Sequence, residues 1–421
     1  MIVCGVIAEF NPFHNGHAYL LEQARLLTHA DYLIIVMSGD YVQRGEPACM
    51  DKYCRVKAAI SAGADAVFEL PVTVATGSAE YFARGAVAAL DALGVVDYLC
   101  FGSESGDLDE LRKLAGNNFR SNHSNIRQFS SNGSLGTELP NNILGIEYLR
   151  ALNYFHSPIK PITVQRQGAG YHDTEPQEGT FCSATALRPL LHSLSDVSFP
   201  YDAAVHSQSS QGETKADLLH RLSGLVPDCT LPIIREYYTS PRYMEFRSLS
   251  DLLFYHFIMH PSEDLTDYFD IYGDLADKIQ NALFQKRPAD LLEFRNSLKT
   301  KDIAMTHINR ALLHILLSIK KSDVDLLIKY EYCAYLRLLG FCKEASPLMN
   351  MIKTSSKCPI ITKLADAKNI LQKDQLSLLE KDIAASNLYQ QLSLINKETA
   401  EFPGEYRQPV IIASRSSSFN F

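Results

Sequence analysis

The stretch IVCGVIAEFNPFHNGH, residues 2–17, decides the fold class. It opens with a compact apolar run at residues 2–8, of the kind that forms a buried parallel strand. A turn that contains Asn11 and Pro12 follows, and helical periodicity then extends over about residues 16–28. The first expected strand therefore leads through a turn directly into a helix.

The same alternation continues through the first half of the chain. Short apolar runs at residues 32–37, 66–70, 98–101 and 162–165 are separated by helical patterns at residues 51–62, 78–93 and 143–152. This rhythm predicts a parallel sheet with right-handed crossovers. The expected fold class is α/β, with a Rossmann-like parallel-sheet domain at residues 1–206.

The second half of the chain has a different pattern. A polar run at residues 207–214 marks the expected boundary, and helical periodicity dominates from there to residue 339 and again at residues 364–395. We therefore expect a mainly α-helical domain at residues 207–400. Residues 401–421 are expected to form a C-terminal tail.

Composition limits the class of protein. The chain has 421 residues, 46% of them hydrophobic, and a net charge of -8, which argues against a generally basic nucleic-acid binder. Its nine cysteines form no Cys-x-x-Cys pair and lie mostly in apolar runs, as reduced thiols do. No run approaches the roughly 20 apolar residues of a membrane span, and no basic leader precedes the first apolar run. We expect a soluble cytoplasmic protein without a membrane partner.

His14 and His17 are the first candidates for chemistry. Residues three apart share a face of a helix, and a helix N-terminus favours an anion. Two imidazoles at that point can stabilise the charge that develops when the α–β phosphate bond of a nucleotide breaks. Gly16 between them allows a close backbone approach. Metal ligation and ordinary surface histidines are the alternatives; no third metal ligand is evident, and no metal site is predicted.

A second candidate element is the run SATALR, residues 183–188. It opens a predicted helix with Ser183 as N-cap. The hydroxyls of Ser183 and Thr185 can meet phosphate oxygens, and Arg188 can neutralise a triphosphate bidentately. Alone, a capped helix with a surface arginine explains the run as well. Together with the His14–His17 turn it suggests two halves of one phosphate site, with His14, His17 and Arg188 as the catalytic candidates.

These motifs resemble those of a known family. NPFHNGH at residues 11–17 resembles the (T/H)xGH signature of HIGH-type nucleotidyltransferases, and residues 183–188 resemble their distal Ser-Thr-x-x-Arg motif. The further runs SGDYVQRGEP (38–47), FELP (68–71), FGSE (101–104), PNNILG (140–145) and GAGYHD (168–173) are similar to the bacterial tRNA(Met) cytidine acetate ligase family. The resemblance is strong over residues 1–191 and weaker beyond.

The resemblance implies an activity and a set of ligands. Members of this family activate acetate with ATP as acetyl-adenylate and acetylate N4 of the wobble cytidine of elongator tRNA(Met), which gives N4-acetylcytidine. Magnesium is expected with the ATP, although no acidic cage in the sequence locates it. The implied ATP contacts are Ile7, Ala8, Glu9, Phe10, Asn11, Pro12, Phe13, His14, Asn15, Gly16, His17, Ala18, Tyr19, Leu20, Gly102, Asn142, Arg166 and Gln167.

Basic residues supply the remaining candidates. Arg44 and Lys52 are weak candidates for neutralising the charge of a substrate or anion, with surface salt bridges as the alternative. A tRNA enzyme also needs arginines near aromatic groups for bases and phosphates. The weak candidates for tRNA contact are Arg235, Arg242, Arg247 and Arg310, and a solvated or partly buried helix face explains them as well.

Two other functions stay open at this point. A small-molecule nucleotidyltransferase of the same fold would share the phosphate site, although such enzymes are often little more than the α/β domain. A non-catalytic RNA-binding protein with a relic nucleotide site is the third possibility, and the intact set of His14, Gly16, His17 and Arg188 argues against it.

Overall fold

The computed structural model describes residues 1–116, 139–167, 181–195, 214–238, 244–285, 288, 290–394 and 404–414. Its centre is a sheet whose core strands are β1 (Val3–Ala8), β2 (Tyr32–Ser38), β5 (Ala66–Leu70), β6 (Tyr98–Ser103) and β7 (Lys160–Gln165). They lie in the order β5-β2-β1-β6-β7, and each neighbouring pair is parallel. The predicted α/β class and parallel pairing are confirmed.

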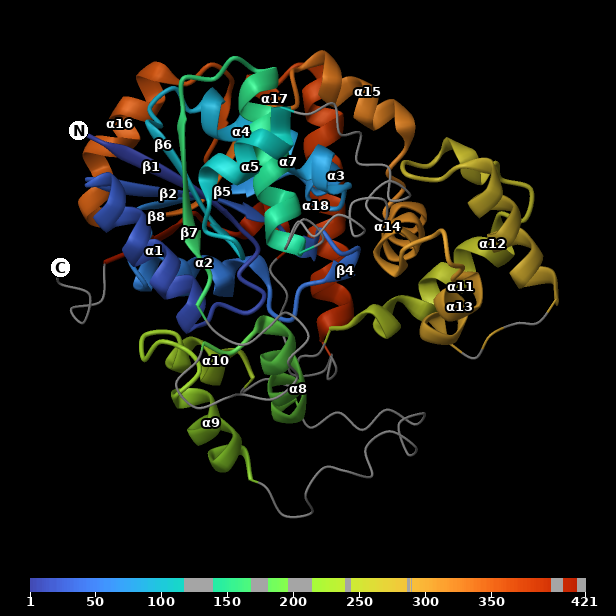
Figure 1. The fold of residues 1–421 in the computed structure, drawn as a ribbon. Helices are drawn as coiled ribbons and strands as arrows, with labels where there is room; N and C mark the ends of the chain where they lie inside the picture. The colour runs from blue at the N-terminus through green and yellow to red at the C-terminus, as the bar shows by residue number, and fades with distance from the viewer. Residues whose placement is uncertain are drawn as a thin grey trace.

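Helices cover both faces of this sheet (Figure 1). Helices α1 (Asn15–Thr28) and α2 (Lys52–Ser61) lie on one side, and α4 (Ala79–Ala92) and α7 (Pro140–Tyr154) lie on the other. The central strand β1 is buried along nearly its whole length, which explains its continuous apolar run. Gly5 lets α4 approach closely, because an added Cβ would lie 2.6 Å from a methyl carbon of Leu90.

Segments from the end of the chain extend the sheet beyond β5. Strand β8 (Leu336–Cys342) is antiparallel to β5, and β9 (Ile360–Ile361) and β10 (Ile411–Ala413) are parallel to β8. This arrangement differs from the consecutive division expected from the sequence. Part of the segment expected to be helical, and part of the expected tail, belong to the central sheet instead.

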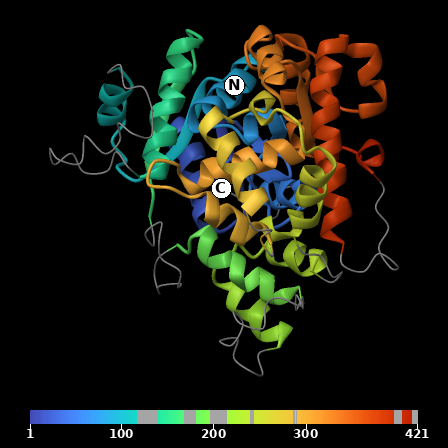
Figure 2. The same cartoon turned by 90° about the vertical axis from the view of Figure 1, so that its right-hand side faces the viewer.

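Helices do dominate between the two groups of strands, and they form two clusters with cores of their own. One cluster packs around Leu253, Phe294 and Leu312, and the other around Leu187 and Leu222. The first contains α11 (Ser250–Met259), α12 (Gly273–Gln285), α13 (Leu291–Leu298) and α14 (Met305–Leu316). The second contains α8 (Ala184–Leu194), α9 (Lys215–Ser223) and α10 (Leu231–Tyr237). Figure 1 and Figure 2 show both clusters beside the sheet domain.

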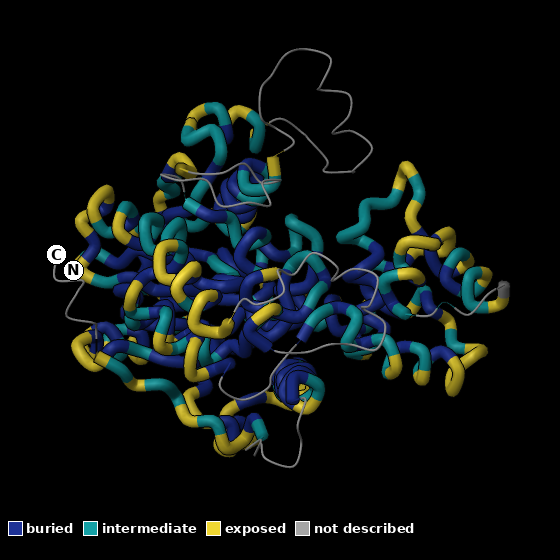
Figure 3. Tube along the Cα trace, turned by 90° about the horizontal axis from the view of Figure 1, so that it is seen from below, coloured by how far each residue is buried: buried dark blue, intermediate teal, exposed yellow. Residues whose placement is uncertain are grey.

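One further long helix links distant parts of the fold. The long helix α18 (Lys373–Ser393) reaches from the sheet domain to the loop after β2, where the hydroxyl of Tyr389 donates to the carbonyl of Ala48 at 2.7 Å. In Figure 3 the buried stretches gather in the middle of the trace, and most exposed stretches lie at its periphery. The other elements are β3 (Tyr41–Val42), β4 (Glu46–Pro47), α3 (Val72–Ala75), α5 (Leu108–Gly116), α15 (Lys321–Lys329), α16 (Ser346–Ser355), α17 (Ala367–Ile370) and the 3-10 helices η3 (Phe246–Leu249), η4 (Leu265–Asp267), η5 (Lys343–Ala345), η6 (Leu364–Asp366) and η7 (Glu405–Arg407).

Among the described residues, no helix combines the length and the apolar character that crossing a membrane requires.

Candidate functional site

The candidate site lies where the order of the core strands reverses. From β1 the chain passes to β2 and β5 on one side, whereas β6 and β7 lie on the other. The crevice outside the carboxyl ends of β1 and β6 is therefore the topological switch point, the usual ligand site of an open parallel sheet. The turn that carries His14 and His17 follows β1, and Gly102 lies near the end of β6.

His14 and His17 cap the first helix with their own side chains. His14 is the N-cap of α1, and its Nδ1 accepts from the main-chain N–H of Gly16 at 3.1 Å. In return, Nδ1 of His17 accepts from the main-chain N–H of His14 at 3.3 Å. Both Nδ1 atoms are thus acceptors, so the proton of each neutral ring sits on Nε2. The two rings stack with their centroids 3.8 Å apart.

The surroundings keep both imidazoles neutral. Burial lowers the pKa of His14 to about 3, and the positive charges of Arg166 and Arg188 act in the same direction. Burial, with the neighbouring His14 and Arg166, also holds the pKa of His17 well below its usual range. At neutral pH the pair therefore presents uncharged Nε2–H donors, which suit hydrogen bonding to an anion.

Three arginines from different parts of the chain converge on this pair. Arg188 of α8 donates to the carbonyl of Asn11 at 3.2 Å and to Oγ1 of Thr185 at 3.1 Å. Burial, followed by repulsion from Arg188, lowers the pKa of Arg44, and burial also lowers the pKa of Arg166. Closely placed like charges of this kind are relieved when an anion binds between them. The predicted pairing of the His14–His17 turn with Arg188 is therefore present in space.

Two adjoining cavities open beside these groups. The smaller one, about 50 Å³, contains His14, Tyr19, Gln167, Phe181 and Ser183 in its wall. The larger one, about 360 Å³, reaches past Glu9 and Arg44 to Thr306 and Arg310 of α14. The residues that line both are His17, Leu20, Gly102 and Arg166. The cavities therefore meet at the second histidine.

Most of the expected nucleotide contacts lie in these walls. Those that line one or both cavities are Ile7, Ala8, Glu9, His14, Gly16, His17, Tyr19, Leu20, Gly102, Arg166, Gln167 and Ser183. The hydroxyl of Ser183 accepts from the main-chain N–H of Ala186, as expected for an N-cap. Thr185 lines neither cavity, and its hydroxyl instead accepts from Arg188 and orients that side chain.

The other expected contacts support the turn that carries His14 and His17 and do not line the two cavities. Phe10 and Phe13 are fully buried and pack edge-on or tilted against the ring of His17. The side chain of Asn11 accepts from the N–H of Cys49 at 2.8 Å, and the amide of Asn15 donates to the carbonyl of Gly224 at 3.1 Å. Pro12 is buried, whereas Ala18 faces a separate surface cleft. These residues support the site by packing and hydrogen bonding.

Asn142, another expected ATP contact, is buried behind the wall of the larger cavity. It is 3% exposed, and its Oδ1 accepts from the main-chain N–H groups of Glu104 and Ser105 at 2.9 and 3.2 Å. It therefore ties the start of α7 to the loop after β6, at the edge of the larger cavity.

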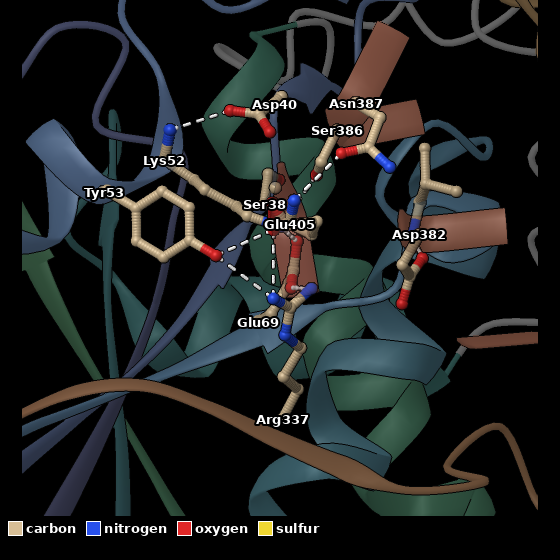
Figure 4. Close-up of polar contacts among 12 residues, drawn as sticks. Ser38, Asp40, Lys52, Tyr53, Glu69, Arg337, Asp382, Ser386, Asn387 and Glu405 are labelled. Carbon is tan, nitrogen blue, oxygen red and sulfur yellow. Dashed lines mark hydrogen bonds and ion pairs between the residues drawn. The ribbon is translucent and has the colours of Figure 1, made fainter. Parts of the chain in front are cut away.

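The prediction for Lys52 was wrong. Its side chain is fully buried, and Nζ lies 2.7 Å from Glu69 Oε1, 2.6 Å from Glu405 Oε1 and 2.7 Å from Ser386 Oγ (Figure 4). Although burial and Arg337 lower the pKa of this amine, the surrounding carboxylates raise it further, so it stays charged. A lysine enclosed in this way cannot neutralise a substrate. The alternative, a surface salt bridge, is right about the pairing but not about the location, because these ion pairs are buried.

Lys52 belongs to a network that joins both ends of the chain. Arg337 of β8 bridges Glu69 at 2.9 Å and Glu405 at 3.0 Å, and the hydroxyl of Tyr53 donates to Glu405 at 2.7 Å. The main-chain N–H of Lys52 donates to Asp40 at 2.7 Å. The network (Figure 4) thus anchors the loop after β2, which carries Arg44 to the larger cavity.

The loop that holds Arg44 also touches α14. Gly45 has φ of +76°, and an added Cβ would lie 2.3 Å from the main-chain nitrogen of Arg310. The sequence did not indicate that α14 forms part of the wall of the larger cavity, because Arg310 was expected only to contact tRNA. The one indication of this contact in the sequence is the run QRG at residues 43–45, since a glycine after an arginine permits such a close approach.

The three described arginines that were expected to contact tRNA differ in their exposure and their partners. Arg235 is exposed on α10, Arg247 bridges Asp290 at 3.1 Å, and Arg310 is buried against Asp270 at 2.8 Å. Arg242 lies outside the described residues. Contact of these residues with tRNA stays a prediction. Arg310 also lines the larger cavity.

Comparison with known proteins agrees with this geometry. The family described as HIGH Nucleotidyl Transferase matches residues 1–402. The tRNA(Met) cytidine acetate ligase of Caldanaerobacter subterraneus subsp. tengcongensis is 33% identical, over 98% of this chain and 100% of that protein. That of Acetivibrio thermocellus is 33% identical over 92% of this chain and 94% of its own.

Solved structures match over nearly the whole chain. The apo structure of Thermotoga maritima TmcAL superposes with a TM-score of 0.83 at 28% identity, covering 98% of this chain and 100% of that one. A second structure of that protein, bound with alpha-thio ATP, gives a TM-score of 0.80 at 26% identity with the same coverage.

Proposed function

Because the chain belongs to the tRNA(Met) cytidine acetate ligase family, we propose that it activates acetate with ATP and transfers the acetyl group to N4 of the wobble cytidine of elongator tRNA(Met). One observation carries the proposal most directly. Two neutral imidazoles and three converging arginines surround the switch-point crevice, and a relative with 26% identity has an ATP analogue bound. A cytoplasmic location is part of the proposal, because tRNA is the proposed substrate.

The first step joins acetate to the α-phosphorus of ATP. Acetate is ionised at neutral pH, so its oxygen attacks without a general base, and pyrophosphate leaves. His14 and His17 donate from Nε2 to the phosphate oxygens that gain charge, and Arg188 stabilises the leaving pyrophosphate. The enzyme's main contribution is the placement of the carboxylate in line with the phosphorus.

Magnesium is proposed to enter with the nucleotide. The described residues contain no group of three His, Cys, Asp or Glu side chains that could hold a metal ion. Glu9 is the one carboxylate among the described residues that line the two cavities. The described residues thus offer no carboxylate cage at this site, and the phosphates of ATP are the natural ligands of the ion.

The second step transfers the acetyl group to the cytidine. The larger cavity has an apolar wall of Phe82, Leu144 and Tyr148 and a polar end at Thr306 and Arg310. A base taken out of its stack is usually held by apolar and aromatic contacts together with a few hydrogen bonds. We therefore assign the cytosine ring to this cavity, next to His17 and the acetyl-adenylate.

A reconstituted assay tests the proposal. Purified protein is incubated with ATP, magnesium and radiolabelled acetate, with elongator tRNA(Met) or with a transcript in which uridine replaces the wobble cytidine. The proposal expects label in the first RNA alone and acetate-dependent exchange of pyrophosphate into ATP. Pyrophosphate exchange that does not require acetate, or equal labelling of both RNAs, would contradict it.

A further inference from the structure

The transfer step leaves a proton without an assigned acceptor. N4 of cytidine forms a bond to the carbonyl carbon of acetyl-adenylate, the bond from that carbon to the phosphate oxygen breaks, and AMP leaves. The attacking amine must then lose one proton to give the neutral amide. An exocyclic amine of this kind is a weak nucleophile, so a positioned base accelerates the step.

The two histidines are poorly suited to accept this proton. Nδ1 of each ring already accepts a main-chain N–H, from Gly16 and from His14 respectively. Nε2 of each neutral ring carries the proton and acts as a donor. The hydrogen bonds that cap α1 thus leave each imidazole with only an Nε2–H donor, which suits phosphate stabilisation and not proton acceptance. The base for the second step has to come from elsewhere in the cavity wall.

Among the described residues, Glu9 is the one carboxylate that lines this cavity. It follows β1 directly and lines the larger cavity together with His17 and Arg44. Its Oε1 accepts from the main-chain N–H of Gln43 at 2.7 Å. This is the one hydrogen bond to its carboxylate within the described residues, so none of them binds Oε2.

The backbone of Glu9 is also held in place. Arg55 of α2 donates from its guanidinium to the carbonyl of Glu9 at 2.7 Å and to the carbonyls of Ser38 and Gly39. Arg55 is 1% exposed and thus acts as a rigid brace between the ends of β1 and β2. A carboxylate fixed at both its main chain and one oxygen has a defined direction, as a proton acceptor needs.

We propose that Glu9 is the general base of the transfer step and takes the proton from N4 of the cytidine through Oε2. The inference rests on the proposed function, because it assigns a residue to the second half of that reaction. The proton then passes from Glu9 to solvent when the acetylated tRNA and AMP leave.

The electrostatics of the position are compatible with this role. Burial raises the pKa of Glu9, while the N–H of Gln43 and the charges of Arg44, Arg55 and Arg188 limit the rise. Tyr148 of α7 faces the same carboxyl, and His17, Arg166 and Arg310 line the same cavity. A base whose pKa is raised from the ordinary range of a carboxyl toward neutrality is more effective at physiological pH.

The test separates the two half-reactions. Preformed acetyl-adenylate and elongator tRNA(Met) are mixed with excess protein, and the single-turnover rate of transfer is compared with the rate of acetate-dependent pyrophosphate exchange. Glu9→Gln keeps the size and the oxygen that accepts from Gln43 but cannot take a proton. We expect it to lower transfer by about 100-fold or more, and to lower exchange much less. Glu9→Asp keeps a carboxylate and should retain more transfer than Glu9→Gln.

A pH series and a matched control complete the experiment. Transfer by the unsubstituted protein should slow as the pH falls through the pKa of Glu9, and Glu9→Gln should lack this acid limb. The control Glu80→Gln removes a carboxylate that pairs with Arg84 on the surface of α4, next to the cavity mouth, and should leave both rates unchanged.

The outcomes distinguish this inference from the proposed function. No acetate-dependent exchange in the unsubstituted protein would overturn the proposed function itself. Normal exchange with undiminished transfer in Glu9→Gln would overturn only the role of Glu9. Equal losses of exchange and transfer in that variant would also overturn it, because they would assign Glu9 to nucleotide binding.

Discussion

His17 accepts a hydrogen bond through Nδ1 from the main-chain N–H of His14, 3.3 Å away, while the two rings stack at 3.8 Å between centroids. The bond couples the start of a helix to the chemistry of the site. It closes the first turn of α1 and at the same time directs the Nε2–H of each ring away from the helix, toward the cavities. The motif thus serves folding and phosphate recognition with the same atoms.

Replacement of His17 should affect adenylation far more than stability. His17→Asn removes an Nε2–H donor, and the loss of one such donor typically costs about 10²–10³ in rate. The lost cap should cost only about 1 kcal/mol of unfolding free energy. Acetate-dependent pyrophosphate exchange and urea unfolding measure the two effects. His29→Asn, at the exposed opposite end of α1, is the matched control, and similar exchange rates in both variants would contradict the assignment.

The buried, neutral state of His14 predicts acid sensitivity. Its pKa is about 3 in the folded protein and near 6.5 when unfolded, so the unfolded state binds more protons between these values and stability falls as the pH falls. Between pH 7 and pH 5 this should cost about 2 kcal/mol. His14→Asn keeps a good N-cap without the titration, so its stability should fall less over this range by about that amount. Parallel pH curves from urea unfolding would refute the prediction.

The Lys52 network should be essential for stability. Lys52→Met leaves Glu69 and Glu405 buried without their partner amine, which typically costs about 3–5 kcal/mol. Lys57→Met makes the same substitution at an exposed position of the same helix and should change the unfolding free energy by less than about 0.5 kcal/mol. Urea unfolding compares the two variants. Equal stabilities would mean that the network contributes nothing.

The contact between the Arg44 loop and α14 can be tested with a pair of glycines. Gly45 and Gly63 both have positive φ, but an added Cβ meets Arg310 only at Gly45 and open space at Gly63. Gly63→Ala should therefore report backbone strain alone, about 1 kcal/mol. Gly45→Ala should cost more stability and also lower acetyl transfer, because it displaces Arg44 and Arg310 in the cavity wall. The contact has no functional role if the two variants transfer acetyl at the same rate.

Local patterns were sufficient to predict the sheet core and half of the site. The apolar runs of β1, β2, β5 and β6 each predict a buried parallel strand. Such strands are apolar throughout because helices cover both of their faces. The His14–His17 turn was identified for the same reason, since strand, turn, N-cap and helix follow one another within about fifteen residues.

Contacts between distant segments could not be predicted in this way. The run of β8 resembles a helix segment between other helices, and its antiparallel place beside β5 depends on pairing across more than 250 residues. Lys52 looked exposed because its partners Ser386 and Glu405 lie more than 300 residues away. The wall that α14 adds to the larger cavity depends likewise on the packing of two separate cores.

The central claim is that this chain acetylates the wobble cytidine of elongator tRNA(Met), and nucleoside mass spectrometry of tRNA tests it most directly. The tRNA is isolated from a strain that lacks the gene and from the same strain that expresses either the unsubstituted chain or His17→Asn. The account predicts that N4-acetylcytidine is lost on deletion, returns with the unsubstituted chain and does not return with the variant. N4-acetylcytidine at an unchanged level in the deletion strain would contradict it.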